Sequence, residues 1–156
     1  MKILSIGNSF SVDSQTWARR VAAAGGETFE LGNLYIGGCS LERHMENVRS
    51  GEAAYDYFVN NENIGRASVR TALMDEKWDY VTVQQASHFS GKPETYFPFI
   101  EELADYARAL APSPSSAPYV VVCPYGISSR RAHTRSRNAE PIRCSGGVKS
   151  GCPPEK

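Results

Sequence analysis

The sequence predicts an α/β fold, with a parallel sheet of about four to five strands and helices on both of its faces. Short apolar runs alternate along the first 123 residues with longer segments of helical period. Such alternation is typical of parallel sheets, whose buried strands are nearly continuous in apolar residues. The order strand, glycine- and serine-containing turn, helix also occurs twice near the N-terminus. Because parallel strands end at one edge of the sheet, both turns should open at that edge.

The first strand is predicted over 2–6, an apolar run that a glycine stops. A helix is predicted from about residue 13 to residue 24. Its apolar face is expected to hold Trp17, Val21 and Ala24, because these residues recur at i, i+4 and i+7. Two consecutive glycines then end the helix.

The later elements follow from the same two signals, apolar periodicity and turn residues. In order, they are a strand over 28–36, a short helix over 41–48, a surface hairpin within 51–67, a helix over 68–77 with Ser68 as its cap, a strand over 80–83, an amphipathic helix over 96–110 with Thr95 as its cap, a linker over 112–118 and a strand over 119–123.

Composition places the chain among soluble globular proteins of one domain. It has 156 residues, of which 41% are hydrophobic and 22% charged, and its formal net charge is zero. Nothing global therefore indicates nucleic acid or a membrane surface as a partner. No apolar run has the length of a transmembrane helix, and the first residues lead directly into a strand without a signal peptide. A cytoplasmic location is expected.

The segment 124–156 differs from the rest of the chain. It carries seven Lys and Arg against two Asp and Glu, is rich in Ser, Gly and Pro, and has almost no apolar periodicity. Such a composition is typical of a disordered or loosely attached tail. The chain is therefore expected to divide into an α/β domain over 1–123 and a basic tail over 124–156.

The four cysteines do not indicate a metal site. Cys39, Cys123, Cys144 and Cys152 form no C-x-x-C pair, their spacing fits no zinc template, and histidines are few. Structural thiols are expected, and neither a metal nor another cofactor is predicted.

The turn after the first strand holds the candidate nucleophile. A serine between a parallel strand and a helix lies at the sheet edge where α/β folds bind ligands, beside the N–H groups of a helix N-terminus. This setting suits a hydroxyl that attacks a carbonyl and stabilises an oxyanion. Serines before helices are, however, more often caps. Ser11 or Asp13 can fill that role, which leaves Ser9 without a structural duty.

Three segments resemble the blocks of SGNH (GDSL-type) hydrolases, in an esterase-like branch. The segment I-L-S-I-G-N-S-F-S resembles the first block, with Asn8 in place of the usual Asp, and I-G-G-C-S-L around Gly38 resembles the second. W-D-Y-V-T-V-Q-Q-A-S-H resembles the third block, with Gln85, chosen over Gln84, in place of the usual Asn. The resemblance covers about 1–123 and implies a three-layer, flavodoxin-like SGNH architecture that is incomplete at its C-terminus.

The resemblance also implies the roles of the site residues. Ser9 would be the nucleophile, and the oxyanion would be held by the N–H groups of Ser9 and Gly38 and by the side-chain amide of Gln85. The implied substrate is a small ester, which the range of the family extends to carbohydrate esters. The oligomeric state does not follow from the sequence.

The general base is missing from the expected place. The family carries an Asp and a His three residues apart near its C-terminus, whereas here no Asp follows Asp105 and Arg130 stands three residues before His133. A truncated or frame-shifted reading beyond about residue 123 would explain this. His88, just after a strand, is the candidate base, while His44 is expected to face solvent. We therefore expect very low esterase activity, and a non-catalytic fold that binds a small anion or sugar is the alternative.

Overall fold

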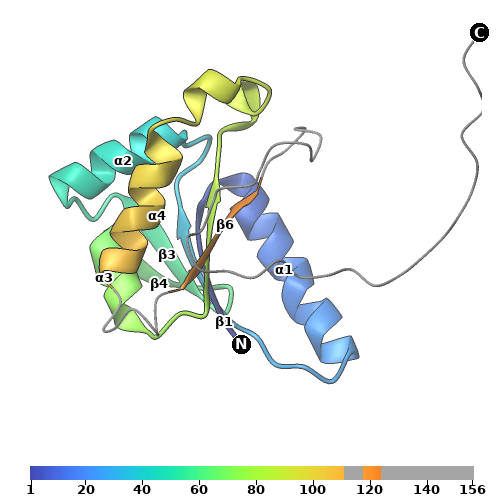
Figure 1. Cartoon of the computed structure of the whole chain (residues 1–156). Helices are drawn as coiled ribbons and strands as arrows, with labels where there is room; N and C mark the ends of the chain where they lie inside the picture. The colour runs from blue at the N-terminus through green and yellow to red at the C-terminus, as the bar shows by residue number, and fades with distance from the viewer. Residues whose placement is uncertain (111–117, 124–156) are drawn as a thin grey trace, which may run out of the picture.

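The chain is an α/β structure of three layers, which confirms the predicted α/β class. The computed structural model describes residues 1–110 and 118–123. One face of the sheet is covered by α1, and the opposite face by α2, α3 and α4 (Figure 1). The α-helices of these residues are α1 (Ser9–Ala24), α2 (Leu41–Ser50), α3 (Val69–Asp75) and α4 (Phe99–Ala109), and the short 3-10 helices η1 (Ser87–Phe89) and η2 (Pro93–Thr95) precede α4.

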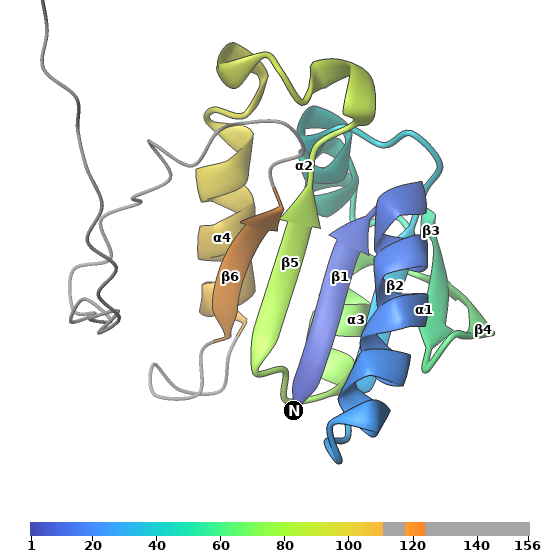
Figure 2. The same cartoon turned by 90° about the vertical axis from the view of Figure 1, so that its right-hand side faces the viewer.

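Over the described residues the sheet has six strands and is mixed, so the expectation of four to five parallel strands is corrected. The strand order is β4-β3-β2-β1-β5-β6. The four strands from β2 to β6 in this order are parallel, and β3 and β4 add an antiparallel edge (Figure 2). The strands are β1 (Lys2–Gly7), β2 (Glu30–Tyr35), β3 (Tyr55–Val59), β4 (Glu62–Ala67), β5 (Tyr80–Gln84) and β6 (Tyr119–Cys123).

The antiparallel edge is the predicted hairpin, which joins the sheet. Its turn residues Asn60 and Asn61 both have positive φ, at 52° and 72°. Positive φ at both central residues is the signature of the hairpin turn whose twist matches that of the flanking strands. The asparagine cluster thus explains why the chain reverses here and adds two strands beside β2.

The helix caps confirm some sequence expectations and correct others. The hydroxyl of Ser68 accepts a hydrogen bond from Thr71 N (3.1 Å), as predicted for the cap of α3. By contrast, α4 begins at Phe99 and not at residue 96, so Thr95 does not cap it. The helical conformation is disfavoured for a residue that directly precedes a proline, and here Phe97 precedes Pro98. The helix therefore starts only after this proline.

The helix α1 begins at Ser9, four residues earlier than predicted, and its predicted apolar face is wrong. The buried side chains are those of Ser11, Gln15 and Ala22. Trp17 and Val21 are 55% and 71% exposed. The reason lies in the sheet, which presents polar side chains to this helix, so that the helix buries the residues that can form hydrogen bonds with them.

These hydrogen bonds form a polar layer between α1 and the sheet. Gln15 Nε2 donates to Ser5 Oγ (2.8 Å) and to the carbonyl of Gly32 (2.7 Å). Ser11 Oγ donates to Asn33 Oδ1 (2.8 Å). Because buried polar groups are costly unless they are paired, this network fixes which face of α1 turns inward.

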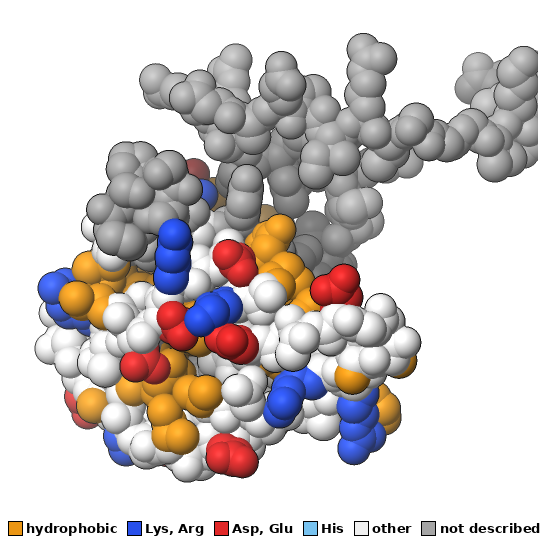
Figure 3. Space-filling view, turned by 90° about the horizontal axis from the view of Figure 1, so that it is seen from below, with side chains coloured by type: hydrophobic (Ala, Val, Ile, Leu, Met, Phe, Trp, Pro, Cys, Tyr) orange, Lys and Arg blue, Asp and Glu red, His pale blue; other side chains and the backbone are white. Residues whose placement is uncertain are grey.

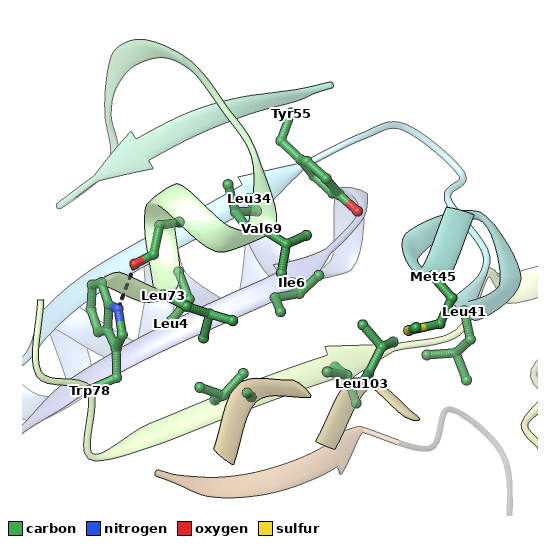
Figure 4. Close-up of a cluster of buried hydrophobic side chains, with 14 of the residues drawn as sticks. Leu4, Ile6, Leu34, Leu41, Met45, Tyr55, Val69, Leu73, Trp78 and Leu103 are labelled. Atoms are coloured by element: carbon green, nitrogen blue, oxygen red, sulfur yellow. Dashed lines mark hydrogen bonds between the residues drawn. The ribbon is translucent and has the colours of Figure 1, made fainter. Parts of the chain in front are cut away.

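The opposite face of the sheet carries the apolar core. Figure 4 shows side chains from β1, β2, α2, α3 and α4 meeting in one cluster. The indole N–H of Trp78, at the end of this cluster, donates to the carbonyl of Ala72 (2.8 Å). The fully or almost fully buried members include Leu4, Ile6, Leu34, Leu41, Tyr55, Val69, Val81, Val83 and Leu103.

Charged side chains of both signs mix at the edge where the parallel strands begin (Figure 3). At this edge Lys2 pairs with Glu30 (2.8 Å) and with Glu76 (2.7 Å).

Within the described ranges, no helix combines the length and apolarity that crossing a membrane requires. The predicted linker over 112–118 falls largely outside the described residues, as does the whole predicted tail over 124–156, and the cytoplasmic location stays a prediction.

Candidate functional site

The two glycine- and serine-containing turns open at the same edge of the sheet, as predicted. Parallel strands β1 and β2 end side by side, with Gly7 opposite Tyr35. Ile36 N then donates to the carbonyl of Gly7 (3.3 Å), so the two segments stay together where the turns begin. Ser9 follows the first strand and Gly38 the second, and both residues are exposed.

This edge includes a point at which the connections change direction. The connection after β1 passes through α1 on one face of the sheet, and the connection after β5 passes through α4 on the other (Figures 1 and 2). Open α/β sheets bind ligands outside the carboxyl ends of their strands at such a switch point. The ends of β1 and β5 are therefore the expected location of a site.

Ser9 is not a helix cap, which resolves the alternative that its position had left open. The cap of α1 is Asn8, whose Oδ1 accepts a hydrogen bond from Phe10 N (3.2 Å). Ser9 is the first helical residue, and neither its hydroxyl nor its N–H has a hydrogen-bond partner among the described residues. The predicted alternative caps are also wrong: Ser11 is buried in the polar layer, and Asp13 is a residue of the first helical turns.

Gly7 and Gly38, the glycines of these two turns, have different structural roles. A Cβ on Gly7 would lie 2.7 Å from both Gln84 Oε1 and Ser11 Oγ, so a side chain does not fit between β1, β5 and α1. Gly38 has φ +64° and open space around a hypothetical Cβ. Its N–H forms no hydrogen bond with the described part of the chain. Gly38 thus offers an accessible N–H in a backbone conformation that favours glycine.

Asn8 ties the turn that carries Ser9 to its two neighbours. Its side chain is buried, and Nδ2 donates to the carbonyls of Cys39 (3.4 Å) and Gln85 (3.3 Å). The first carbonyl belongs to the turn of Gly38, and the second follows β5. An aspartate at this position would offer no N–H to these carbonyls, which is why an amide suits it.

Gln85 lies where the sequence predicted it, directly after β5, but its amide is already engaged. Oε1 accepts hydrogen bonds from Leu41 N (3.1 Å) and Ala86 N (2.8 Å). Nε2 donates to Thr95 O (2.9 Å) and to Thr95 Oγ1 (3.1 Å). The side chain is buried, and both amide hydrogens have partners, so the structure does not present it as a free donor to an oxyanion.

The two histidines of the described region differ in environment. His88 is exposed on η1 and packs against the ring of Phe89, with 4.1 Å between the ring centroids. His44 is fully buried, contrary to the expected exposure, because α2 turns this residue toward β3. Neither histidine is hydrogen-bonded to Ser9 in the described structure. His133 lies outside the described residues.

His44 belongs to a buried polar cluster behind the turn of Gly38. Its Nδ1 lies 2.8 Å from the hydroxyl of Tyr55 and 3.5 Å from Cys39 Sγ, while Nε2 has no hydrogen-bond partner among the described residues. Burial lowers the pKa of His44 to about 3, so the imidazole is neutral at physiological pH. Burial likewise raises the pKa of the Cys39 thiol to about 12, which agrees with a structural thiol.

The sequence did not identify Asn8 and Thr95 as residues that organise this edge. A signal was present for Asn8, since an amide replaced the expected carboxylate at a helix start. For Thr95 the sequence pattern predicts a cap of α4 instead. No group of three or more potential metal ligands occurs in the part of the chain that the structure describes. What the edge offers chemically is an exposed hydroxyl and two N–H groups, those of Ser9 and Gly38, that have no hydrogen-bond partner in the described part of the chain.

Comparisons with known proteins place the chain in a family. No curated protein matches it. It is similar to a DUF4886 family protein from Bacteroides uniformis ATCC 8492, whose crystal structure was determined at 1.50 Å, with 40% sequence identity and a TM-score of 0.69. That similarity covers 78% of this chain and 48% of the other, so the chain spans about half the length of this relative. Residues 2–136 match the family DUF4886, described as a domain of unknown function, and the chain belongs to this family.

Proposed function

We propose that this fold is that of an SGNH-type serine ester hydrolase, with Ser9 as its nucleophile. The observation that carries the proposal is the environment of Ser9. Its hydroxyl is exposed and has no hydrogen-bond partner in the described structure, at the N-terminus of α1 and at the carboxyl edge of the sheet. Serines with a structural duty at this place normally cap the helix, and here Asn8 does so.

The strand order supports the finer fold assignment. Read in sequence order among the parallel strands alone, β2-β1-β5-β6 corresponds to 2-1-3-4. The flavodoxin-like doubly wound order is 2-1-3-4-5, with its ligand site at the switch point beside the first strand. The parallel part of this sheet matches the first four positions of that order.

In the proposed reaction, Ser9 Oγ attacks the carbonyl carbon of a small ester and loses its proton to a base. The oxyanion that forms accepts hydrogen bonds from the N–H groups of Ser9 and Gly38, and collapse of the intermediate expels the alcohol, which takes up the proton that the base holds. Water then hydrolyses the acyl-serine. Each such donor contributes roughly 3–4 kcal/mol of transition-state stabilisation. A carbohydrate ester is the proposed substrate class, on the range of the resembled family alone.

Gln85 does not serve as the third donor in this proposal, because its amide hydrogens are engaged with Thr95. No base is hydrogen-bonded to Ser9 among the described residues. A serine hydroxyl without a base is a poor nucleophile, so slow turnover is expected for this chain. His88 follows the end of β5 on an exposed segment and is the described histidine that remains a candidate.

Hydrolysis of p-nitrophenyl acetate by purified protein tests the proposal. Very slow turnover above the buffer rate is expected, and Ser9→Ala should abolish it. If His88 is the base, His88→Ala should reduce the rate to the level of Ser9→Ala. Turnover that survives Ser9→Ala would contradict the proposal.

The alternative is a fold that binds a small anion or sugar without chemistry. It is favoured by one observation: no imidazole of the described residues is hydrogen-bonded to Ser9. Free N–H groups at a helix N-terminus suit an anion as well as an oxyanion. Covalent labelling of Ser9 by a fluorophosphonate separates the two functions, because a binding fold has no activated hydroxyl.

A further inference from the structure

Two adjacent glutamines at the end of β5 have opposite environments. Gln84 and Gln85 are both buried, but they point to opposite faces of the sheet because side chains alternate along a strand. Oε1 of Gln84 has no hydrogen-bond partner among the described residues. The amide of Gln85 has four partners, all of them uncharged. This difference in hydrogen bonding indicates a specific structural role for the side chain of Gln85.

The side chain of Gln85 joins two segments that are distant in sequence. Its Oε1 holds Leu41 N, the first N–H of α2, immediately after the turn of Gly38. Its Nε2 holds both the carbonyl and the hydroxyl of Thr95. One amide group thus links the start of α2 to the segment 87–96.

The backbone of Gln85 adds a third segment. Its carbonyl accepts a hydrogen bond from Asn8 Nδ2 (3.3 Å), and Asn8 is the cap that precedes Ser9. The turn of Ser9, the start of α2 directly after the turn of Gly38, and the segment 87–96 are therefore all hydrogen-bonded to one residue. These are the segments that follow β1, β2 and β5 at the carboxyl edge of the sheet (Figure 2).

The segment 87–96 holds its own shape. Thr95 Oγ1 donates to the carbonyl of Lys92 (2.8 Å), and the hydroxyl of Tyr96 donates to the carbonyl of Ser90 (3.1 Å). Since these bonds stay within the segment, they do not attach it to α2. The bonds from Gln85 to Thr95 make that attachment.

We infer that Gln85 is a positioning residue, which fixes the turn of Gly38 and the segment 87–96 relative to Ser9. The inference rests on the proposed function for its effect on reactivity. This positioning role takes the place of the predicted role of Gln85 as an oxyanion donor. The amide of Gln85 is buried and has four hydrogen-bond partners in the protein, so it affects the site through the backbone segments that it holds. Loss of this amide should leave the fold intact and shift the geometry around Ser9.

The main test uses Gln85→Glu, which changes one atom of the side chain. One carboxylate oxygen can still accept from Leu41 N and Ala86 N, but the other faces the carbonyl of Thr95 and cannot donate to it. Protonation restores a donor, and burial raises the pKa of such a carboxyl group. Relative to the wild type at the same pH, fluorophosphonate labelling of Ser9 should fall by roughly 10-fold or more at pH 8, the size expected for an unmet buried hydrogen bond, and should recover at pH 5.

A matched pair of variants tests the positioning role by a measurement that does not depend on the reactivity of Ser9. Gln85→Met should speed amide hydrogen exchange across 87–96 by roughly 10-fold or more, because the buried bonds to Thr95 are lost. Gln84→Met replaces the adjacent glutamine and should leave exchange in that segment unchanged. Circular dichroism tests whether both variants are folded. If Gln85→Met is not folded, Gln85→Glu provides a second variant for the exchange measurement.

The outcomes separate the inference from the proposed function. Faster exchange in Gln85→Met with no labelling of wild-type Ser9 supports the positioning role and contradicts the hydrolase. Normal exchange in Gln85→Met and Gln85→Glu, with wild-type labelling in both at pH 8, overturns the inference. A labelling loss in Gln85→Glu that does not recover at pH 5 also overturns it, since protonation should restore the bond to Thr95.

Discussion

The two faces of the sheet are built by different chemistry. The face under α2, α3 and α4 is packed with apolar side chains, among them Leu4, Ile6 and Leu103. The face under α1 is joined to that helix by hydrogen bonds, in which Gln15 and Ser11 take part. Apolar burial is non-directional, whereas a hydrogen-bond layer specifies register. The polar layer therefore fixes α1, and with it the place of Ser9 at the helix start.

The largest expected effect comes from the apolar face. Leu103 of α4 is 1% exposed and lies in the core (Figure 4). Leu103→Ala removes buried methyl groups and leaves a cavity, so it should lower the free energy of unfolding by about 2–5 kcal/mol. Urea denaturation measures this change. A loss below about 1 kcal/mol would show that this face does not dominate the stability.

The histidine buried on the apolar face should make the stability of the fold depend on pH. His44 has its pKa lowered to about 3 by burial, while an unfolded histidine titrates near 6.5. Between these values the unfolded state binds more protons, so this group's stabilisation is fully present above pH 6.5 and is lost as pH falls toward 3. The limiting slope is about 1.4 kcal/mol per pH unit. Urea denaturation of His44→Phe and wild type between pH 7 and pH 4.5 checks this.

In that experiment the stability of the wild type should fall more steeply with decreasing pH than that of the variant. All other titrating groups are shared by the two proteins, so the difference in slope belongs to His44. Parallel pH profiles would contradict the burial of a neutral imidazole.

The smallest effect is expected on the polar face. Gln15→Ala leaves Ser5 Oγ and the carbonyl of Gly32 without this donor, and should lower the free energy of unfolding by about 1–3 kcal/mol. Trp17→Ser on the same helix is the control. Trp17 is 55% exposed, so its replacement should change stability by less than about 0.5 kcal/mol. If Trp17→Ser is the more destabilising variant, the inward face of α1 has been misidentified.

The strands of the parallel sheet were predictable because their apolar runs are short and bounded by glycine or polar residues. The inward face of α1 was not, because a periodicity rule assumes that apolar residues turn toward the sheet. In α1 the apolar residues Trp17 and Val21 also recur with helical period, but the partners of the helix are polar. The pairing of Gln15 with Ser5 and Gly32 and that of Ser11 with Asn33 decide the face, and such pairing depends on tertiary contacts.

The candidate site was predictable in its location and only partly in its roles. The strand–turn–helix order placed Ser9 and Gly38 at one edge. It did not indicate that Gln85 bonds to Leu41 and Thr95, because these residues are 44 and 10 positions away in sequence. The same limit applies to His44, whose burial depends on Tyr55 of a neighbouring strand.

Fluorophosphonate labelling of the intact chain, read by peptide mass spectrometry, shows whether Ser9 is an activated nucleophile. Ser11→Ala is the matched control, since Ser11 is a buried hydrogen-bonded serine two residues away. An adduct on Ser9 is expected in the wild type and in Ser11→Ala, and none in Ser9→Ala. An unlabelled wild type, or an adduct that persists in Ser9→Ala, would contradict this role of Ser9.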